Sequence, residues 1–60
     1  MKKRATVLFV DDEKINLLLF EKRFEKDFDV FVATSGPEAL DLLKEYAQSI
    51  NVVISDMRMA

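Results

Sequence analysis

The sequence contains no cysteine and no histidine, and its 60 residues include a single glycine. Without cysteine the chain can form neither a disulfide nor a thiolate metal site. Without histidine it lacks the commonest metal ligand and general base, which excludes every Ser-His or Cys-His nucleophile pair. The lone glycine, Gly36, excludes a glycine-rich phosphate-binding loop. These absences leave the acidic residues as the main candidates for site chemistry.

Long apolar stretches are also missing, and neither sign of charge dominates. Half of the residues are hydrophobic, a third are charged and the net charge is −2, which is typical of a globular protein. No run is long enough for a signal peptide or a membrane span, so we expect one small cytoplasmic domain, residues 1–60, without membrane contact. We interpret the basic first residues as a frayed terminus, and the segment Phe20–Phe24 as an apolar core stripe with charged residues on its outer face. Neither is interpreted as a nucleic-acid contact.

Strand and helix patterns alternate along the chain. Three short apolar runs end at charged or polar residues and predict strands, and two segments with helical spacing lie between them. The predicted elements are a strand at Thr6–Val10, a helix at about Lys14–Lys26, a strand at Val30–Ala33, a helix from about Ser35 to Ala47 and a strand at Val52–Ile54. This β-α-β-α-β order predicts an α/β fold with right-handed crossovers and a parallel sheet.

The two helices carry different signals. The first has two apolar stripes, and we expect it to need two partners; the stripes are Leu17, Phe20 and Phe24, and nearly opposite them Ile15, Leu18 and Leu19. The second begins with a capping box formed by Ser35 and Glu38, with Pro37 in its first turn. Its apolar face is predicted to comprise Ala39, Leu40, Leu43, Tyr46 and Ala47. The third strand, Val52–Ile54, is expected to be buried.

Acidic residues follow two of the predicted strands. Asp11 and Asp12 come after the first, and Asp56 comes shortly after the third. If the first strand lies between the other two, the carboxyl ends of the first and third strands are neighbours. Open parallel sheets bind ligands at this edge. Three converging carboxylates suit Mg²⁺, and Asp56 could then act as a nucleophile. Taken singly, acids at strand ends are ordinary solvated loop residues or helix-dipole partners.

Three motifs, in this order and spacing, resemble the receiver domains of bacterial response regulators. They are residues 7–13 (VLFVDDE), 34–40 (TSGPEAL) and 52–59 (VVISDMRM), and the resemblance covers nearly the whole chain. It implies a flavodoxin-like, doubly wound parallel sheet with strand order 2-1-3. It also implies a phosphorelay module that is not an enzyme: Asp56 accepts a phosphoryl group from a sensor histidine kinase. Mg²⁺ is then held by Asp11, Asp12, Asp56 and the main-chain carbonyl of Arg58.

The sequence departs from that family in length. Receivers are about twice as long, and the hydroxyl and lysine side chains that contact their phosphoryl group have no counterpart in these 60 residues. We therefore expect a truncated receiver domain with weak or no phosphoryl acceptance. The third strand would have a bare outer edge, which predicts a homo-oligomer formed through that edge and the first helix. The alternative hypothesis is a self-associating half-domain without phosphorelay activity.

Overall fold

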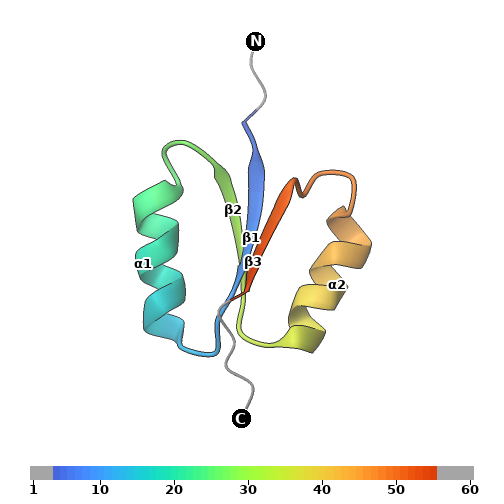
Figure 1. Ribbon diagram of the computed structural model, residues 1–60, viewed down its shortest axis with the longest axis horizontal. Helices are drawn as coiled ribbons and strands as arrows, with labels where there is room; N and C mark the ends of the chain where they lie inside the picture. The colour runs from blue at the N-terminus through green and yellow to red at the C-terminus, as the bar shows by residue number, and fades with distance from the viewer. Residues whose placement is uncertain (1–3, 56–60) are drawn as a thin grey trace.

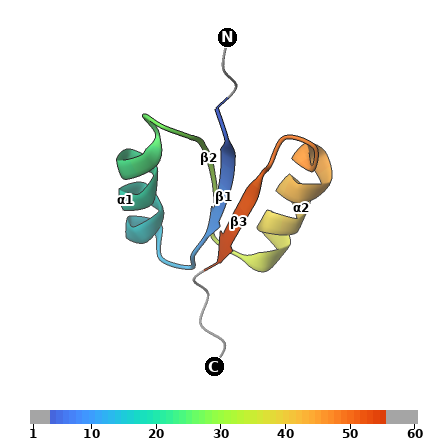
Figure 2. The ribbon, with the colours of Figure 1, turned by 45° about the horizontal axis from the view of Figure 1, so that its top comes forward.

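A computed structural model describes residues 4–55 and confirms the five predicted elements. They are β1 (Thr6–Val10), α1 (Lys14–Phe24), β2 (Asp29–Ala33), α2 (Gly36–Tyr46) and β3 (Val52–Ser55). All three strands are parallel, and the sheet has the order β2-β1-β3. Figure 1 shows α1 and α2 on opposite sides of the sheet, and Figure 2 shows the same arrangement after rotation. The predicted α/β fold, a truncated flavodoxin-like sheet in the order 2-1-3, is therefore confirmed.

The central strand, β1, is buried along its whole length. Leu8 and Val10 pack with Ala33 of β2 and Ala39 of α2 in one core layer. On the other side of the sheet, the ring of Phe9 stacks on Phe20 of α1 at a centroid distance of 4.2 Å. Alternate residues of β1 thus point to opposite helices, as expected for a strand covered on both faces.

The first turn of α2 is held by the predicted capping pair. The hydroxyl oxygen of Ser35 accepts a hydrogen bond from the backbone N–H of Glu38, at 3.3 Å. The Glu38 carboxylate reaches back to Thr34, accepting from its N–H at 2.7 Å and its hydroxyl at 2.9 Å. A standard capping box would direct that carboxylate to Ser35, one residue later. The bond from the Thr34 N–H, followed by that from its hydroxyl, lowers the pKa of Glu38 below its ordinary value of 4.5.

The predicted stripes of α1 are confirmed. Leu17 is buried against the sheet, and Phe20 and Phe24 are half-buried. The opposite stripe of Ile15, Leu18 and Leu19 is about half exposed or more, so it has no partner among residues 4–55. The helix ends at Phe24, slightly before the predicted Lys26.

The burial predictions are wrong for part of the α2 face and for the third strand. Ala47, predicted on the apolar face of α2, is exposed. Leu40 is 57% exposed, whereas Leu42 packs on the core. Each residue of a helix is rotated by about 100° from the one before, so Leu40 points away from the buried Ala39 and Leu42 lies nearer to its side of the helix. The third strand, Val52–Ile54, is not buried, since its side chains are 40–48% exposed. Both helices lie over β1 and β2, and neither lies against β3 in the described part of the chain.

Between residues 4 and 55, no helix has the length and apolar character needed to cross a membrane.

Candidate functional site

Asp11 occupies the carboxyl end of the central strand and is almost fully buried, with 2% of its surface exposed. Its backbone N–H donates to the carbonyl of Ala33, at 3.1 Å, so the pairing of β1 with β2 continues into this residue. The aspartate is thus fixed by the sheet rather than carried on a free loop.

Two neutral donors hold the Asp11 carboxylate. Oδ1 accepts from the backbone N–H of Glu13 at 2.9 Å, and Oδ2 accepts from the side-chain amide of Asn16 at 3.2 Å. The same Asn16 nitrogen also donates to Oε1 of Glu13, at 3.2 Å. Asn16 therefore links two acids at the start of α1. Asn16 was not predicted as a site residue, and its only signal in the sequence is an amide three residues after Glu13 in the first helical turn.

No cation balances Asp11 within residues 4–55, where the one ion pair joins Arg4 and Asp29 at 3.6 Å. A buried carboxylate without a charged partner is costly in free energy. An ionised carboxylate has about four lone-pair positions, and the bonds from Glu13 and Asn16 use two of them. Asp11 thus retains the capacity to bind a cation.

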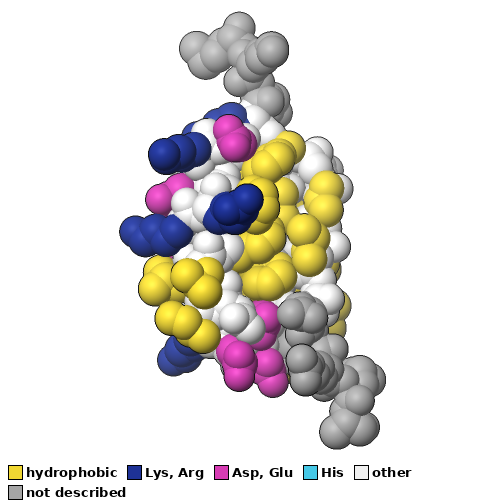
Figure 3. Space-filling model, turned by 60° about the vertical axis from the view of Figure 1, so that its left-hand side comes forward, with side chains coloured by type: hydrophobic (Ala, Val, Ile, Leu, Met, Phe, Trp, Pro, Cys, Tyr) yellow, Lys and Arg dark blue, Asp and Glu magenta, His cyan; other side chains and the backbone are white. Residues whose placement is uncertain are grey.

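The neighbouring acids are more accessible. Asp12 and Glu13 are exposed, and Asp12 makes no side-chain hydrogen bond or ion pair with any other residue of the described range. Figure 3 shows acidic side chains gathered at this end of the molecule. Asp12 is therefore the acid of the β1–α1 loop that can turn towards a ligand without losing a protein contact.

The other predicted site residues, Asp56 and Arg58, lie outside the described residues. Strand register nevertheless aligns Val10 of β1 with Ser55 of β3, so the carboxyl ends of these two strands are neighbours, as predicted. Asp11 follows Val10 in the sequence, and Asp56 follows Ser55. Between residues 4 and 55, no group of three acidic side chains comes together as a metal site.

The donor set nevertheless fits a magnesium ion. Mg²⁺ prefers oxygen ligands, keeps several waters and is commonly bound through one or two carboxylates together with a phosphate. A buried carboxylate with spare lone pairs, Asp11, beside an exposed one, Asp12, meets that requirement. Histidine and cysteine, which zinc and copper prefer, are absent from the chain.

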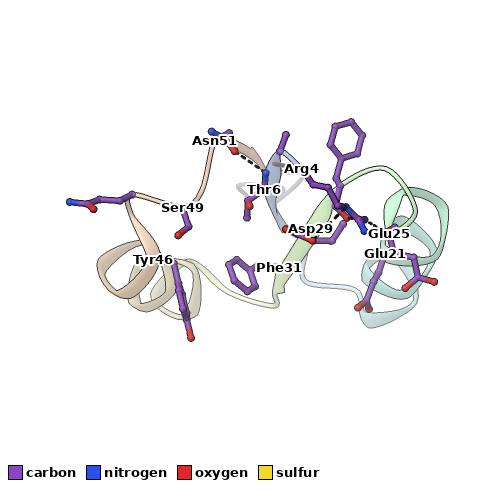
Figure 4. Close-up of a pocket in the computed structure, with 13 residues that line it drawn as sticks. Arg4, Thr6, Glu21, Glu25, Asp29, Phe31, Tyr46, Ser49 and Asn51 are labelled. Atoms are coloured by element: carbon purple, nitrogen blue, oxygen red, sulfur yellow. Dashed lines mark hydrogen bonds and ion pairs between the residues drawn. The ribbon is translucent and has the colours of Figure 1, made fainter. Parts of the chain in front are cut away.

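A wide hollow lies at the opposite end of the sheet. It is an open groove of about 1060 Å³, and its walls include Arg4, Phe31, Tyr46 and Asn51. Figure 4 shows Arg4 beside Asp29, while Asn51 approaches Thr6. This groove was not predictable from the sequence, because residues of β1, β2, both helices and the segment before β3 meet there only in the fold.

Many polar groups of this groove already have partners. Arg4 donates to the carbonyls of Glu25 and Phe28 at the end of α1, the latter at 2.6 Å. Oδ1 of Asn51 accepts from the backbone N–H of Thr6 at 2.8 Å. These hydrogen bonds hold the chain after α1 and the chain before β3 in place. The polar side chains of the groove therefore have structural roles. The acidic end remains the candidate site.

In the comparisons with known proteins, no family model, no curated protein and no solved structure matches this chain.

Proposed function

We propose that this chain is a phosphoacceptor signalling module of the response-regulator receiver type, with Asp56 as the acceptor. The observation that carries the proposal is the pairing of β1 with β3, which makes the strand ends preceding Asp11 and Asp56 neighbours. Asp11, buried and without a charged partner within residues 4–55, adds support. The three motifs quoted from the sequence connect this arrangement with receiver domains.

Magnesium is part of the proposal. The ligands would be the carboxylates of Asp11, Asp12 and Asp56 and the main-chain carbonyl of Arg58. When bound, Mg²⁺ supplies positive charge that offsets the negative charge of an incoming phosphoryl group. Asn16 and the Glu13 backbone hold the Asp11 carboxylate in one orientation, so little reorganisation is needed when the ion binds.

The proposed reaction transfers a phosphoryl group between two side chains. A carboxylate oxygen of Asp56 forms a bond to phosphorus, and the bond from phosphorus to the imidazole nitrogen of a sensor-kinase phosphohistidine breaks. The electron pair of that bond returns to the imidazole. The product is an aspartyl-phosphate, which makes this chain a phosphate acceptor and not an enzyme. A cytoplasmic location, where the kinase would meet it, belongs to the same proposal.

We expect transfer to this 60-residue chain to be slow. Receivers use a hydroxyl side chain and a lysine to contact the phosphoryl group, and residues 1–60 contain no counterpart of either. No lysine follows Asp56 in the sequence. Residues 1–60 therefore supply only the acidic side chains of the proposed site.

The test is incubation with acetyl phosphate and Mg²⁺, followed by intact-mass measurement. We expect a slowly accumulating, substoichiometric mass increase of one phosphoryl group, abolished by Asp56→Asn and by omission of Mg²⁺. The matched control is Asp41→Asn, an exposed aspartate of α2. An adduct that survives Asp56→Asn would assign the acceptor elsewhere, and no adduct at any time would contradict the proposal.

A second candidate function is self-association without phosphoryl transfer. It is favoured by the exposure of Val52, Val53 and Ile54, which is unusual for aliphatic residues on a strand. A chain that oligomerises but forms no phosphoryl adduct would support this function over the first. A third outcome would indicate a metal-binding module: the chain binds Mg²⁺ in a titration, Asp12→Ala abolishes that binding, and no phosphoryl adduct forms.

A further inference from the structure

The outer edge of β3 is an uncovered, apolar strand edge. Val52, Val53 and Ile54 are 47%, 48% and 40% exposed, although β1, directly beside them, is buried along its whole length. No strand within residues 4–55 pairs with this edge, and neither helix lies against β3. Figure 3 shows hydrophobic side chains gathered over a broad area of the molecular surface.

The other edge of the sheet is protected in ways that β3 is not. Both helices lie against β2, and its residues from Val30 to Val32 are half-buried. At its start, Asp29 forms an ion pair with Arg4, which places charge at that edge. Natural edge strands are commonly shielded by charges, proline or covering elements. In β3 the sequence is Val-Val-Ile-Ser, with neither charge nor proline.

We propose that the β3 edge binds the β3 edge of a second copy of this chain, forming a symmetric dimer with one continuous six-stranded sheet. A two-fold axis perpendicular to the sheet would set the two strands antiparallel, and each copy would contribute the same surface. This dimer rests on the second candidate function, self-association, and gives it a partner and a geometry; it would form whether or not Asp56 accepts phosphate.

The sequence of this edge is complementary to itself. With the axis at Val53, that residue lies opposite its own copy, and Val52 lies opposite Ile54 on the other face of the sheet. The flanking polar residues, Asn51 and Ser55, also face one another. Every cross-strand pair is thus aliphatic with aliphatic or polar with polar, and no like charges lie opposite one another.

Both faces of the sheet contribute to this contact. Register places Val53 beside Leu8, on the α2 side, and Val52 and Ile54 beside Val7 and Phe9, on the α1 side. Strand pairing would satisfy the backbone groups of the edge and cover apolar side chains above and below it. Two copies would then cover part of the aliphatic surface that Val52, Val53 and Ile54 expose in each.

The test uses charge at the two-fold axis. Val53→Lys and Val53→Glu each place like charges opposite one another and should be folded monomers by sedimentation and circular dichroism. An equimolar mixture of the two should restore the dimer, because lysine then faces glutamate. The matched control is Leu40→Lys, a similarly exposed aliphatic position on α2, which should remain as dimeric as the unchanged chain.

A monomeric unchanged chain at micromolar concentration would overturn the proposal. So would a Val53→Lys variant that is folded and dimeric, or a mixture of the two variants that stays monomeric. If the variants fail to fold, amide hydrogen exchange of the unchanged chain decides: protection of residues 52–55 should rise with protein concentration, while that of β2 should not. Exchange that is independent of concentration would contradict the dimer.

Discussion

Asp11 is the residue on which the candidate site depends most. It is nearly inaccessible, yet its carboxylate is held only by the Glu13 N–H and the Asn16 amide. Neutral donors fix the direction of a carboxylate while leaving its charge uncompensated. The bond from the Glu13 N–H is also a common turn contact of aspartate, so a structural role and cation binding make different predictions only at Asn16.

Replacing Asn16 tests that interpretation. Asn16→Ala removes the amide that joins Asp11 to Glu13, and we expect Mg²⁺ affinity to fall about tenfold, as for other residues that orient metal ligands. Calorimetric titration measures the affinity, and Gln48→Ala, at the opposite end of the sheet, is the control. A variant that is less stable but binds Mg²⁺ unchanged would show that Asn16 is only structural.

Glu38 gives a second prediction at the residue scale. Its pKa is lowered in the folded chain because its carboxylate accepts hydrogen bonds from the N–H and the hydroxyl of Thr34. A lowered pKa means that this stabilisation is present above the ordinary value of 4.5 and is lost as the pH falls through the lower folded value.

Thermal unfolding across this pH range checks the sign. Glu38→Gln should lower the melting temperature at neutral pH, and the difference from the unchanged chain should shrink as the solution becomes acidic. Glu45→Gln, near the end of the same helix, is the control for loss of one exposed carboxylate. A Glu38→Gln difference that is constant with pH would contradict a role for the charged form.

Among the elements, α1 shows how far the sequence determines packing. Its two apolar stripes are visible in the sequence, but only the fold decides which one meets the sheet. Leu17 is 6% exposed and Leu18 is 49% exposed, although they are adjacent and chemically identical. The stacking of Phe20 on Phe9 fixes that choice.

The same pair of residues provides a matched experiment. Leu17→Ala should lower the free energy of unfolding by about 2–3 kcal/mol, because it leaves a cavity between α1 and the sheet. Leu18→Ala should change it by less than about 0.5 kcal/mol, as for most exposed positions. Chemical denaturation at one protein concentration measures both. Equal losses would mean that the outer stripe of α1 is also covered in solution.

The elements themselves were predictable because their signals are local. A capping serine, apolar runs and helical spacing determine where each element begins and ends. The exposure of Leu40 and of β3 was not predictable in this way, since it depends on which elements lie over them. Asn16 was missed for a related reason, because a single amide acquires its role only when the chain brings it to Asp11.

At the scale of the whole molecule, the fold separates two ends and leaves one side open. The acids of the β1–α1 loop lie at one end of the sheet, and the groove around Arg4 and Asn51 lies at the other. Alternation and handedness predicted a parallel sheet, whereas the order β2-β1-β3 was implied only by the resemblance to receiver domains; this order makes the ends of β1 and β3 neighbours. The proposed dimer would close the open side without covering the acidic end.

The proposed role of Asp56 as phosphoryl acceptor is tested most directly by locating the modified residue. After treatment with acetyl phosphate and Mg²⁺, borohydride reduces an aspartyl-phosphate to homoserine, and peptide mass spectrometry identifies the position that changed. We predict homoserine at position 56, and none when Mg²⁺ is omitted. Homoserine at position 11 or 12 instead, or at no position, would contradict the account.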